Sequence, residues 1–243
     1  MIRSILLGAT AILMMTSCGK EKQDVDLNIL LQYQGEPLVM LQNYTYPTGE
    51  TFFLSRVSMF VANVALDDQV LLTEDYYSLT EAHSTAALAA SGYTTDLAEL
   101  EDGTYNNLSF DIGVTAENNA MVPGDFPSSN VLSQAGEHWP GWGSYVFYKI
   151  EGMLDTDGDG TMDQGMSLHI GGDEVFTSVS IPVSTTIDES NTAIGIALDL
   201  YEVFNGGGQP YDIVSNSGLH SKADHLTFMQ ELMANTKNAL KPN

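Results

Sequence analysis

Apolar and polar residues alternate with a period of two along much of this chain, and this pattern constrains its fold most. Every second residue of 108–114 (LSFDIGV) is apolar, and residues 175–183 and 194–200 repeat the pattern. Successive side chains of a strand point to opposite faces, so the pattern predicts strands with one buried face. Further strands are expected at 26–34, 52–66, 69–78, 145–152 and 165–171.

The order of these strands predicts an all-β fold. Turn-rich stretches such as YPTGE, EDGTYN and NGGGQP separate them, and no regular alternation with helices is present. Such a series favours an antiparallel β-sandwich, Ig-like or Greek-key, over an open barrel. A weak helix is expected at 81–91. A short C-terminal helix should begin at the capping pair Ser221 and Asp224 and pack on the sandwich.

The N-terminus has the features of an export signal. An apolar run follows Arg3, and small residues precede Cys18, the single cysteine of the chain. This arrangement resembles a bacterial lipobox and predicts a signal peptide at 1–17, a lipid anchor on Cys18 and a tether at 18–25. The alternative is an ordinary signal peptide with a chance cysteine. One folded domain is expected at 26–243, held at a membrane surface outside the cytoplasm.

The charge of the chain is strongly negative. Eight lysines and arginines oppose 32 aspartates and glutamates, which gives a formal net charge of −24. Such a surface repels nucleic acid and anionic headgroups and attracts cations, so no nucleic-acid partner is expected. Plain solubility is the simpler explanation for most of these charges.

One acidic loop matches part of a calcium-binding pattern. Aspartates at relative positions 1, 3, 5 and 9, with glycine at 6, agree with the first part of an EF-hand loop. The twelfth position holds Met166 in place of glutamate, and the flanks are strands, so an EF-hand is rejected. The loop is either a structural calcium site in a hairpin or a solvated acidic turn. Its aspartates are Asp155, Asp157, Asp159 and Asp163.

Catalytic motifs are missing from the sequence. The chain has no GxSxG elbow, phosphate-binding glycine loop, HExxH, CxxC or CxxCH. No nucleophile and base can be paired from the sequence, so a role without catalysis is expected.

The histidines and tryptophans are the remaining candidates for a site. Both tryptophans, Trp139 and Trp142, lie in one Pro/Gly-rich turn, directly after His138. In the absence of a thiolate, imidazoles are the natural ligands here for copper or zinc. The five histidines are His83, His138, His169, His220 and His225.

The order of several segments resembles the MbnP-like copper-binding proteins of bacterial periplasms and outer membranes. The resemblance covers nearly all of the chain after Cys18, and each motif by itself is short. The segments are QGEPL (34–38), FFLSRVSMFVANVAL (52–66), GTYNNLSFDIG (103–113), the tryptophan turn with YVFYKIEG (145–152), LHIGG (168–172) and NTKNAL (235–240).

This resemblance implies a β-sandwich that binds copper through histidines. His138 and His169 are the expected ligands, with His220 in reserve. It also implies a tryptophan that a partner di-haem cytochrome c peroxidase-like protein oxidises to kynurenine. Trp139 is the better candidate, because Trp142 falls outside the usual register of the family. The implied protein is an outer-membrane lipoprotein, facing the periplasm or the cell surface, that serves copper acquisition, storage or tolerance.

Two other interpretations of the tryptophans remain open. The indoles could simply cover one end of the sandwich. Alternatively Trp139, Trp142 and Tyr145 could form an exposed aromatic platform in a non-catalytic module that binds glycan or protein and is stabilised by calcium.

Overall fold

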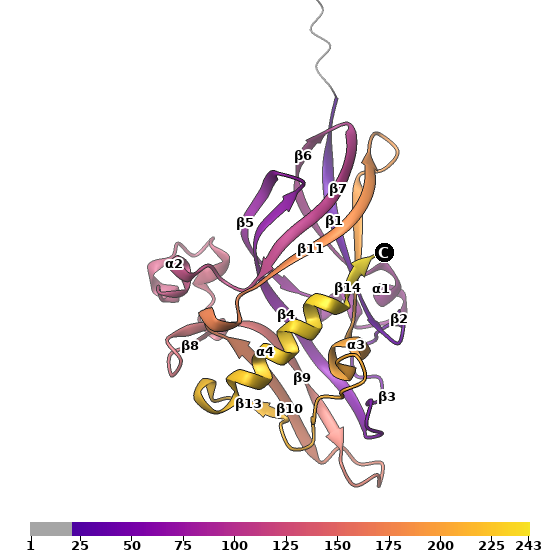
Figure 1. Ribbon diagram of the computed structural model, residues 1–243, viewed down its shortest axis with the longest axis vertical. Helices are drawn as coiled ribbons and strands as arrows, with labels where there is room; N and C mark the ends of the chain where they lie inside the picture. Colours follow the sequence, from indigo (N-terminus) through magenta and orange to yellow (C-terminus); the bar gives the residue numbers. More distant parts are fainter. Residues whose placement is uncertain (1–20) are drawn as a thin grey trace, which may run out of the picture.

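A computed structural model of the chain describes residues 21–243, and two β-sheets packed face to face form most of it (Figure 1). The prediction of an all-β sandwich is confirmed. The smaller sheet consists of β1 (Lys22–Tyr33), β2 (Glu36–Pro37), β6 (Tyr93–Glu101), β12 (Ala193–Asp199) and β14 (Leu240–Pro242).

The larger sheet is built around β4, which pairs with β5, β7 and β9 along different parts of its length. Its strands are β3 (Tyr44–Thr45), β4 (Thr51–Leu66), β5 (Gln69–Ser78), β7 (Gly103–Ile112), β8 (His138–Trp139), β9 (Ser144–Asp155), β10 (Gln164–Gly171), β11 (Thr177–Ile187) and β13 (Gly218–Leu219).

The helices are short except the last. No helix of the described chain is both long and apolar enough to span a membrane. The α-helices are α1 (Ala86–Ser91), α2 (Ala116–Asn119), α3 (Leu200–Asn205) and α4 (Lys222–Ala239). The 3-10 helices are η1 (Glu81–His83), η2 (Pro123–Asp125), η3 (Val131–Ser133), η4 (Ala135–Glu137) and η5 (Asp173–Val175).

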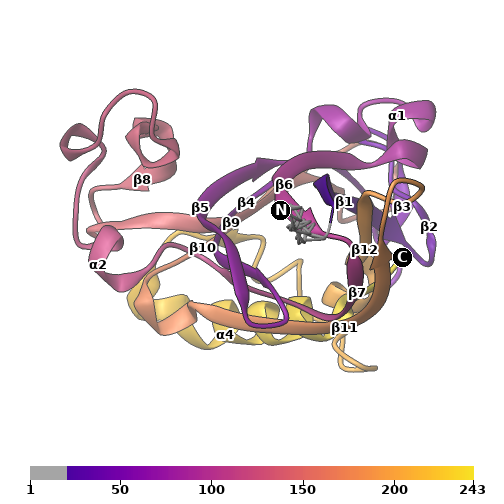
Figure 2. The same ribbon diagram turned by 90° about the horizontal axis from the view of Figure 1, so that it is seen from above.

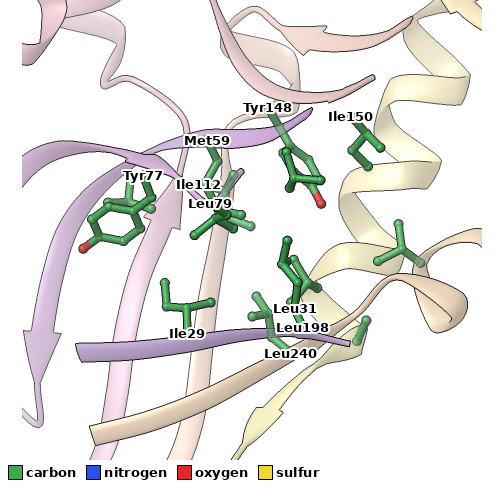
Figure 3. Packing of buried hydrophobic residues seen from close by; sticks show 14 of the residues in the cluster. Ile29, Leu31, Met59, Tyr77, Leu79, Ile112, Tyr148, Ile150, Leu198 and Leu240 are labelled. Atoms are coloured by element: carbon green, nitrogen blue, oxygen red, sulfur yellow. The ribbon is translucent and has the colours of Figure 1, made fainter. Parts of the chain in front are cut away.

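The core lies between the two sheets, where the apolar residues of each alternating strand meet. Ile29 of β1 and Leu198 of β12 face Met59 of β4 and Ile112 of β7 in Figure 3. Burying a side chain of this size contributes about 1.5–3 kcal/mol to folding. The alternation therefore does what the sequence predicts: it gives each strand one buried face.

Two strand pairs run parallel in a sheet system that is otherwise antiparallel. β1 pairs with β12, and β10 pairs with β13, in the same direction. The partners in each pair are far apart in sequence, so no tight hairpin forces them to be antiparallel. Periodicity predicts the strands but not their direction.

The first strand begins earlier than the sequence predicts. Residues 22–25, assigned to the tether, belong to β1, where Lys22 pairs with Glu101 and Val25 is buried. The alternation of β1 extends to Val25, so these residues join the sheet. The predicted signal peptide at 1–17 and the lipid anchor at Cys18 lie outside the described residues.

The C-terminal helix closes one side of the sandwich, as Figure 1 shows. The Ser221 hydroxyl accepts a hydrogen bond from the Asp224 N–H, which confirms the predicted cap. Met229 and Met233 are buried, and α4 contacts strands of both sheets. The adjoining β14 pairs with β12, which fixes the end of the chain to the smaller sheet.

A lobe that contains α2 and β8 projects from the larger sheet (Figure 2). It connects β7 to β9 through several 3-10 turns. Glu74 of β5 anchors its start by accepting hydrogen bonds from the Thr115 N–H and the Asn118 amide. The lobe carries the turn with both tryptophans back to the start of β9.

His83 is a core residue and not a ligand. Its Nε2 accepts a hydrogen bond from the Leu31 N–H at 3.3 Å, so its Nδ1 carries the proton and donates to the Leu38 carbonyl at 3.0 Å. Burial lowers the pKa of His83 below its ordinary value of 6.5. Protonation of His83 would place an N–H at Nε2, directly against the Leu31 N–H.

This buried imidazole predicts a loss of stability in mild acid. Below about pH 6.5 the unfolded chain binds a proton at His83 that the folded chain resists, so the free energy of unfolding falls as the pH falls. In His83→Gln the amide keeps one acceptor and one donor and does not titrate. Urea unfolding of both proteins between neutral pH and pH 5 should show the wild type losing more stability. Equal losses would contradict the assignment.

Candidate metal centre

A tight hairpin at the start of β9 carries both tryptophans. In it His138 pairs with Tyr145, and Trp139 pairs with Ser144. The Trp142 N–H closes the turn by donating to the Trp139 carbonyl at 3.0 Å. The chain therefore folds Trp142 back over Trp139, which gives the three-residue spacing of the tryptophans a structural purpose.

The two indoles stack on each other. Their ring centroids lie 4.8 Å apart with an interplanar angle of 10°, and both residues are half-buried. The Trp142 Nε1–H donates to the His220 carbonyl at 3.2 Å. Gly171 lies underneath, where a Cβ atom would be 2.4 Å from the Tyr145 carbonyl oxygen and 3.2 Å from the Trp142 ring. Glycine at 171 therefore permits the close approach of the Tyr145 backbone and leaves room for the Trp142 ring.

Two histidines meet beside Trp139. Leu168 of β10 pairs with Leu219 of β13, and the next residue of each segment is a histidine. The parallel register therefore brings His169 and His220 together, with ring centroids 5.2 Å apart. These rings lie 5.8 Å and 5.5 Å from the Trp139 ring, respectively.

A carboxylate fixes the orientation of His169. Its Nε2 lies 2.7 Å from Oε1 of Glu151, which is ionised and can only accept, so Nε2 carries the proton. The hydrogen bond from His169 holds the pKa of Glu151 below its ordinary value. The other nitrogen, Nδ1, is buried and has no hydrogen-bond partner among the described residues. Its lone pair is free for a ligand, the arrangement common to metal-binding histidines.

The other two expected ligands have lowered pKa values, which favours their neutral imidazole form. Burial, followed by the neighbouring His169 and His225, lowers the pKa of His220. Burial alone lowers the pKa of His138, whose ring packs edge-on against Tyr145 with centroids 5.0 Å apart.

Two clefts flank the Trp139 side chain. One, of about 340 Å³, is lined by His138, Trp139 and His169. The other, of about 600 Å³, is lined by Trp139, Trp142 and His220. The structure thus brings His169 and His220 together and places His138 in the smaller cleft.

A buried ion network anchors the hairpin. Glu137, directly before His138, lies 2.6 Å from Arg56 of β4 and 2.7 Å from the Lys149 ammonium of β9. The Lys149 Nζ also donates to the Gly136 carbonyl at 3.0 Å. Two strands of the larger sheet therefore hold the residues that lead into Trp139.

The acidic loop lies at the opposite end of β9 from the tryptophans. Within the described chain, one set of three or more His, Cys, Asp or Glu side chains has its ligand atoms all within 4.8 Å of one another: Asp155, Asp157 and Asp159. Asp163 is not part of this set. Its carboxylate accepts hydrogen bonds from the backbone and hydroxyl of Thr156.

The structure adds two functional residues that sequence reasoning missed, Glu151 and Glu137. Their partners lie on other strands of the larger sheet: Glu137 pairs with Arg56 and Lys149, and Glu151 with His169. No local motif reveals these contacts. The available signal was the pair of charged residues, Lys149 and Glu151, in an otherwise apolar strand. A charge in such a strand needs a partner, because it is costly to bury alone.

Tyr145 cannot be part of an exposed aromatic platform with Trp139 and Trp142. Tyr145 is fully buried, and its hydroxyl donates to the Leu132 carbonyl at 2.6 Å. One face of each indole is covered by the other indole, so the turn presents no row of open rings for a sugar.

The family model described as MbnP matches residues 22–222. A search of the solved structures found MbnP from Methylosinus trichosporium, with a TM-score of 0.52 and 15% sequence identity, over 76% of this chain and 78% of that one. A search of the curated proteins found no match.

Proposed function

The chain belongs to the MbnP family, and on this premise we propose that it is an extracytoplasmic copper-binding lipoprotein whose metal centre is formed by His169 and His220 beside Trp139. Its role is to acquire, store or buffer copper without catalysis. Lipid chains on Cys18 hold it at the outer membrane, facing the periplasm or the cell surface.

The free lone pair of His169 is the observation that carries this proposal. A buried imidazole nitrogen without a partner costs free energy unless a ligand fills it. The hydrogen bond to Glu151 fixes the tautomer of His169 that carries its proton on Nε2. The Nδ1 atom is then directed away from the carboxylate. A carboxylate behind a histidine also raises the basicity of the coordinating nitrogen.

The distance between the two imidazoles fits a shared ion. An ion about 2 Å from one nitrogen of each ring holds the ring centroids about 5–6 Å apart, and the observed separation is 5.2 Å. Structural zinc sites take four protein ligands, whereas Cu(I) accepts two or three. A pair of imidazoles therefore favours copper over zinc.

Trp139 lies next to both imidazoles of the proposed centre. Its oxidation to kynurenine would add a carbonyl and an aniline nitrogen next to both imidazoles. We propose that a di-haem cytochrome c peroxidase-like partner performs this oxidation. The half-buried position of Trp139 between two clefts supports the proposal, because the ring is accessible while the hairpin fixes its orientation.

Equilibrium dialysis of the full chain against Cu(I), with Zn(II) in parallel, tests the proposal. One retained copper per chain, and no zinc under the same conditions, is the expected result. Failure to retain copper above the level of His169→Ala would refute the copper function.

We also propose that the acidic loop holds a structural calcium ion through Asp155, Asp157 and Asp159. Adding calcium at about 100 times its Kd should stabilise the fold by about 2.7 kcal/mol. Asp157→Asn should abolish this gain, because it removes one negative charge from the exposed part of the cluster.

Asp163→Asn is the matched control for the calcium prediction. Its side chain lies with Thr156 and outside the cluster, so the calcium response should persist. Thermal unfolding with and without calcium distinguishes the two variants. A wild-type melting temperature that is the same with and without calcium would identify the loop as a solvated turn.

A further inference from the structure

The stacked indoles differ in what surrounds their pyrrole edges. The Trp142 Nε1–H donates a hydrogen bond to the His220 carbonyl. The pyrrole edge of Trp139 faces Gly141, where even a Cβ atom would lie only 3.3 Å from Nε1 and 3.4 Å from Cδ1. Gly141 is exposed and has no side chain that could cover this edge of Trp139.

We propose that Trp142 is the electron relay for the oxidation of Trp139: electrons leave through Trp142 while oxygen enters at the open pyrrole edge of Trp139. This inference rests on the oxidation of Trp139 in the proposed function. It assigns a separate role to each tryptophan.

The geometry of the stack supports electron sharing. Two nearly parallel rings with centroids 4.8 Å apart are in van der Waals contact, so their π orbitals overlap and a positive charge on one spreads over both. Spreading the charge makes the pair easier to oxidise than a single indole. Electron transfer also weakens steeply with distance, which favours exchange between stacked rings over transfer through solvent.

Trp142 also lies where an electron acceptor can approach. It lines the larger cleft together with His220, Lys222 and Leu226 at the start of α4. Its ring stacks on Trp139 on one face, its Nε1–H donates to the His220 carbonyl, and a Cβ atom at Gly171 would lie 3.2 Å from its Cζ3. A ring held this tightly is suited to passing electrons and poorly placed to take up oxygen.

The chemistry balances with peroxide as the oxidant. The Cδ1–Cγ bond of Trp139 breaks and each carbon gains one oxygen from water, with loss of four electrons and four protons, to give N-formylkynurenine. Two molecules of hydrogen peroxide, reduced to four waters at the haem peroxidase, accept those electrons and protons. A further water removes the formyl group as formate and leaves kynurenine. Trp142 is oxidised and reduced again at each transfer and ends unchanged.

Photo-oxidation of the metal-free full chain tests the relay without the biological partner. Ruthenium tris-bipyridyl with persulfate serves as the one-electron oxidant, and peptide mass spectrometry follows oxygen incorporation at Trp139. In Trp142→Phe, which keeps an aromatic ring but resists oxidation, the initial rate should fall about tenfold or more. In Trp142→Tyr, which is oxidisable, most of the rate should return.

Two further measurements separate this role from a structural one. Copper retention should be equal in the Phe and Tyr variants, because neither changes His169 or His220. Gly141→Ala should slow oxygen incorporation at Trp139 while leaving the transient indole radical yield unchanged.

Several results would overturn the relay. These are equal oxygenation rates in wild type and Trp142→Phe, oxygen found on Trp142 in the wild type, or no oxygenation of Trp139 at all. Because the protein is free of metal in this experiment, each of these outcomes leaves copper binding to be judged separately by dialysis.

Discussion

Replacing Glu137 by alanine should lower the free energy of unfolding by about 3–5 kcal/mol. The substitution leaves the buried Lys149 ammonium beside Arg56, with no carboxylate between them. Like charges in a poorly solvated site repel each other, and the Lys149 side chain is only 6% exposed. Urea unfolding of the variant measures the loss directly.

The matched control is Glu174→Ala. Its carboxylate pairs with Lys222 at 2.6 Å, but the Glu174 side chain is 47% exposed and that of Lys222 29%. Exposed ion pairs contribute only about 0–1 kcal/mol, so this variant should unfold close to the wild type. A loss in Glu137→Ala no larger than in this control would show that the network does not hold the hairpin.

The second large effect is expected at His169. His169→Ala removes one of two imidazoles and should weaken Cu(I) binding by more than about a hundredfold, beyond the 10- to 100-fold typical of losing an outer partner. Glu151→Ala should fall within that smaller range, because Nδ1 remains but its orientation is lost. Competition with a chromophoric Cu(I) chelator measures both.

His225→Ala is the control for copper binding. His225 accepts a hydrogen bond from the Ser221 N–H at the start of α4 and has no ring contact with Trp139 among the described residues. Its removal should change the affinity far less than His169→Ala does. Unchanged Cu(I) affinity in His169→Ala together with lost affinity in His138→Ala would contradict this centre. It would place the copper in the smaller cleft, at His138.

Much of the fold could be predicted from periodicity, because alternation reports directly on a half-buried strand. β6 escaped this reasoning: of its nine residues only Leu97 and Leu100 are buried, so its alternation is weak. The parallel pairing of β1 with β12 escaped it as well, since a strand's pattern is the same in either direction.

The site could be predicted in its members but not in its geometry. Residue type and position singled out Trp139 and His169 together with His138, and placed His220 only in reserve. Their convergence depends on the parallel register of β10 and β13, two segments about fifty residues apart in sequence. Glu151 could not be predicted as a partner of His169, because the contact runs diagonally across the β9–β10 hairpin.

Anomalous diffraction at the copper absorption edge, from crystals of the protein purified from its native host, tests the central claim most directly. We predict one peak within coordination distance of the His169 Nδ1 and the His220 imidazole, next to the ring of residue 139. A copper peak in the acidic loop alone, or no copper peak, would contradict the assignment of this centre.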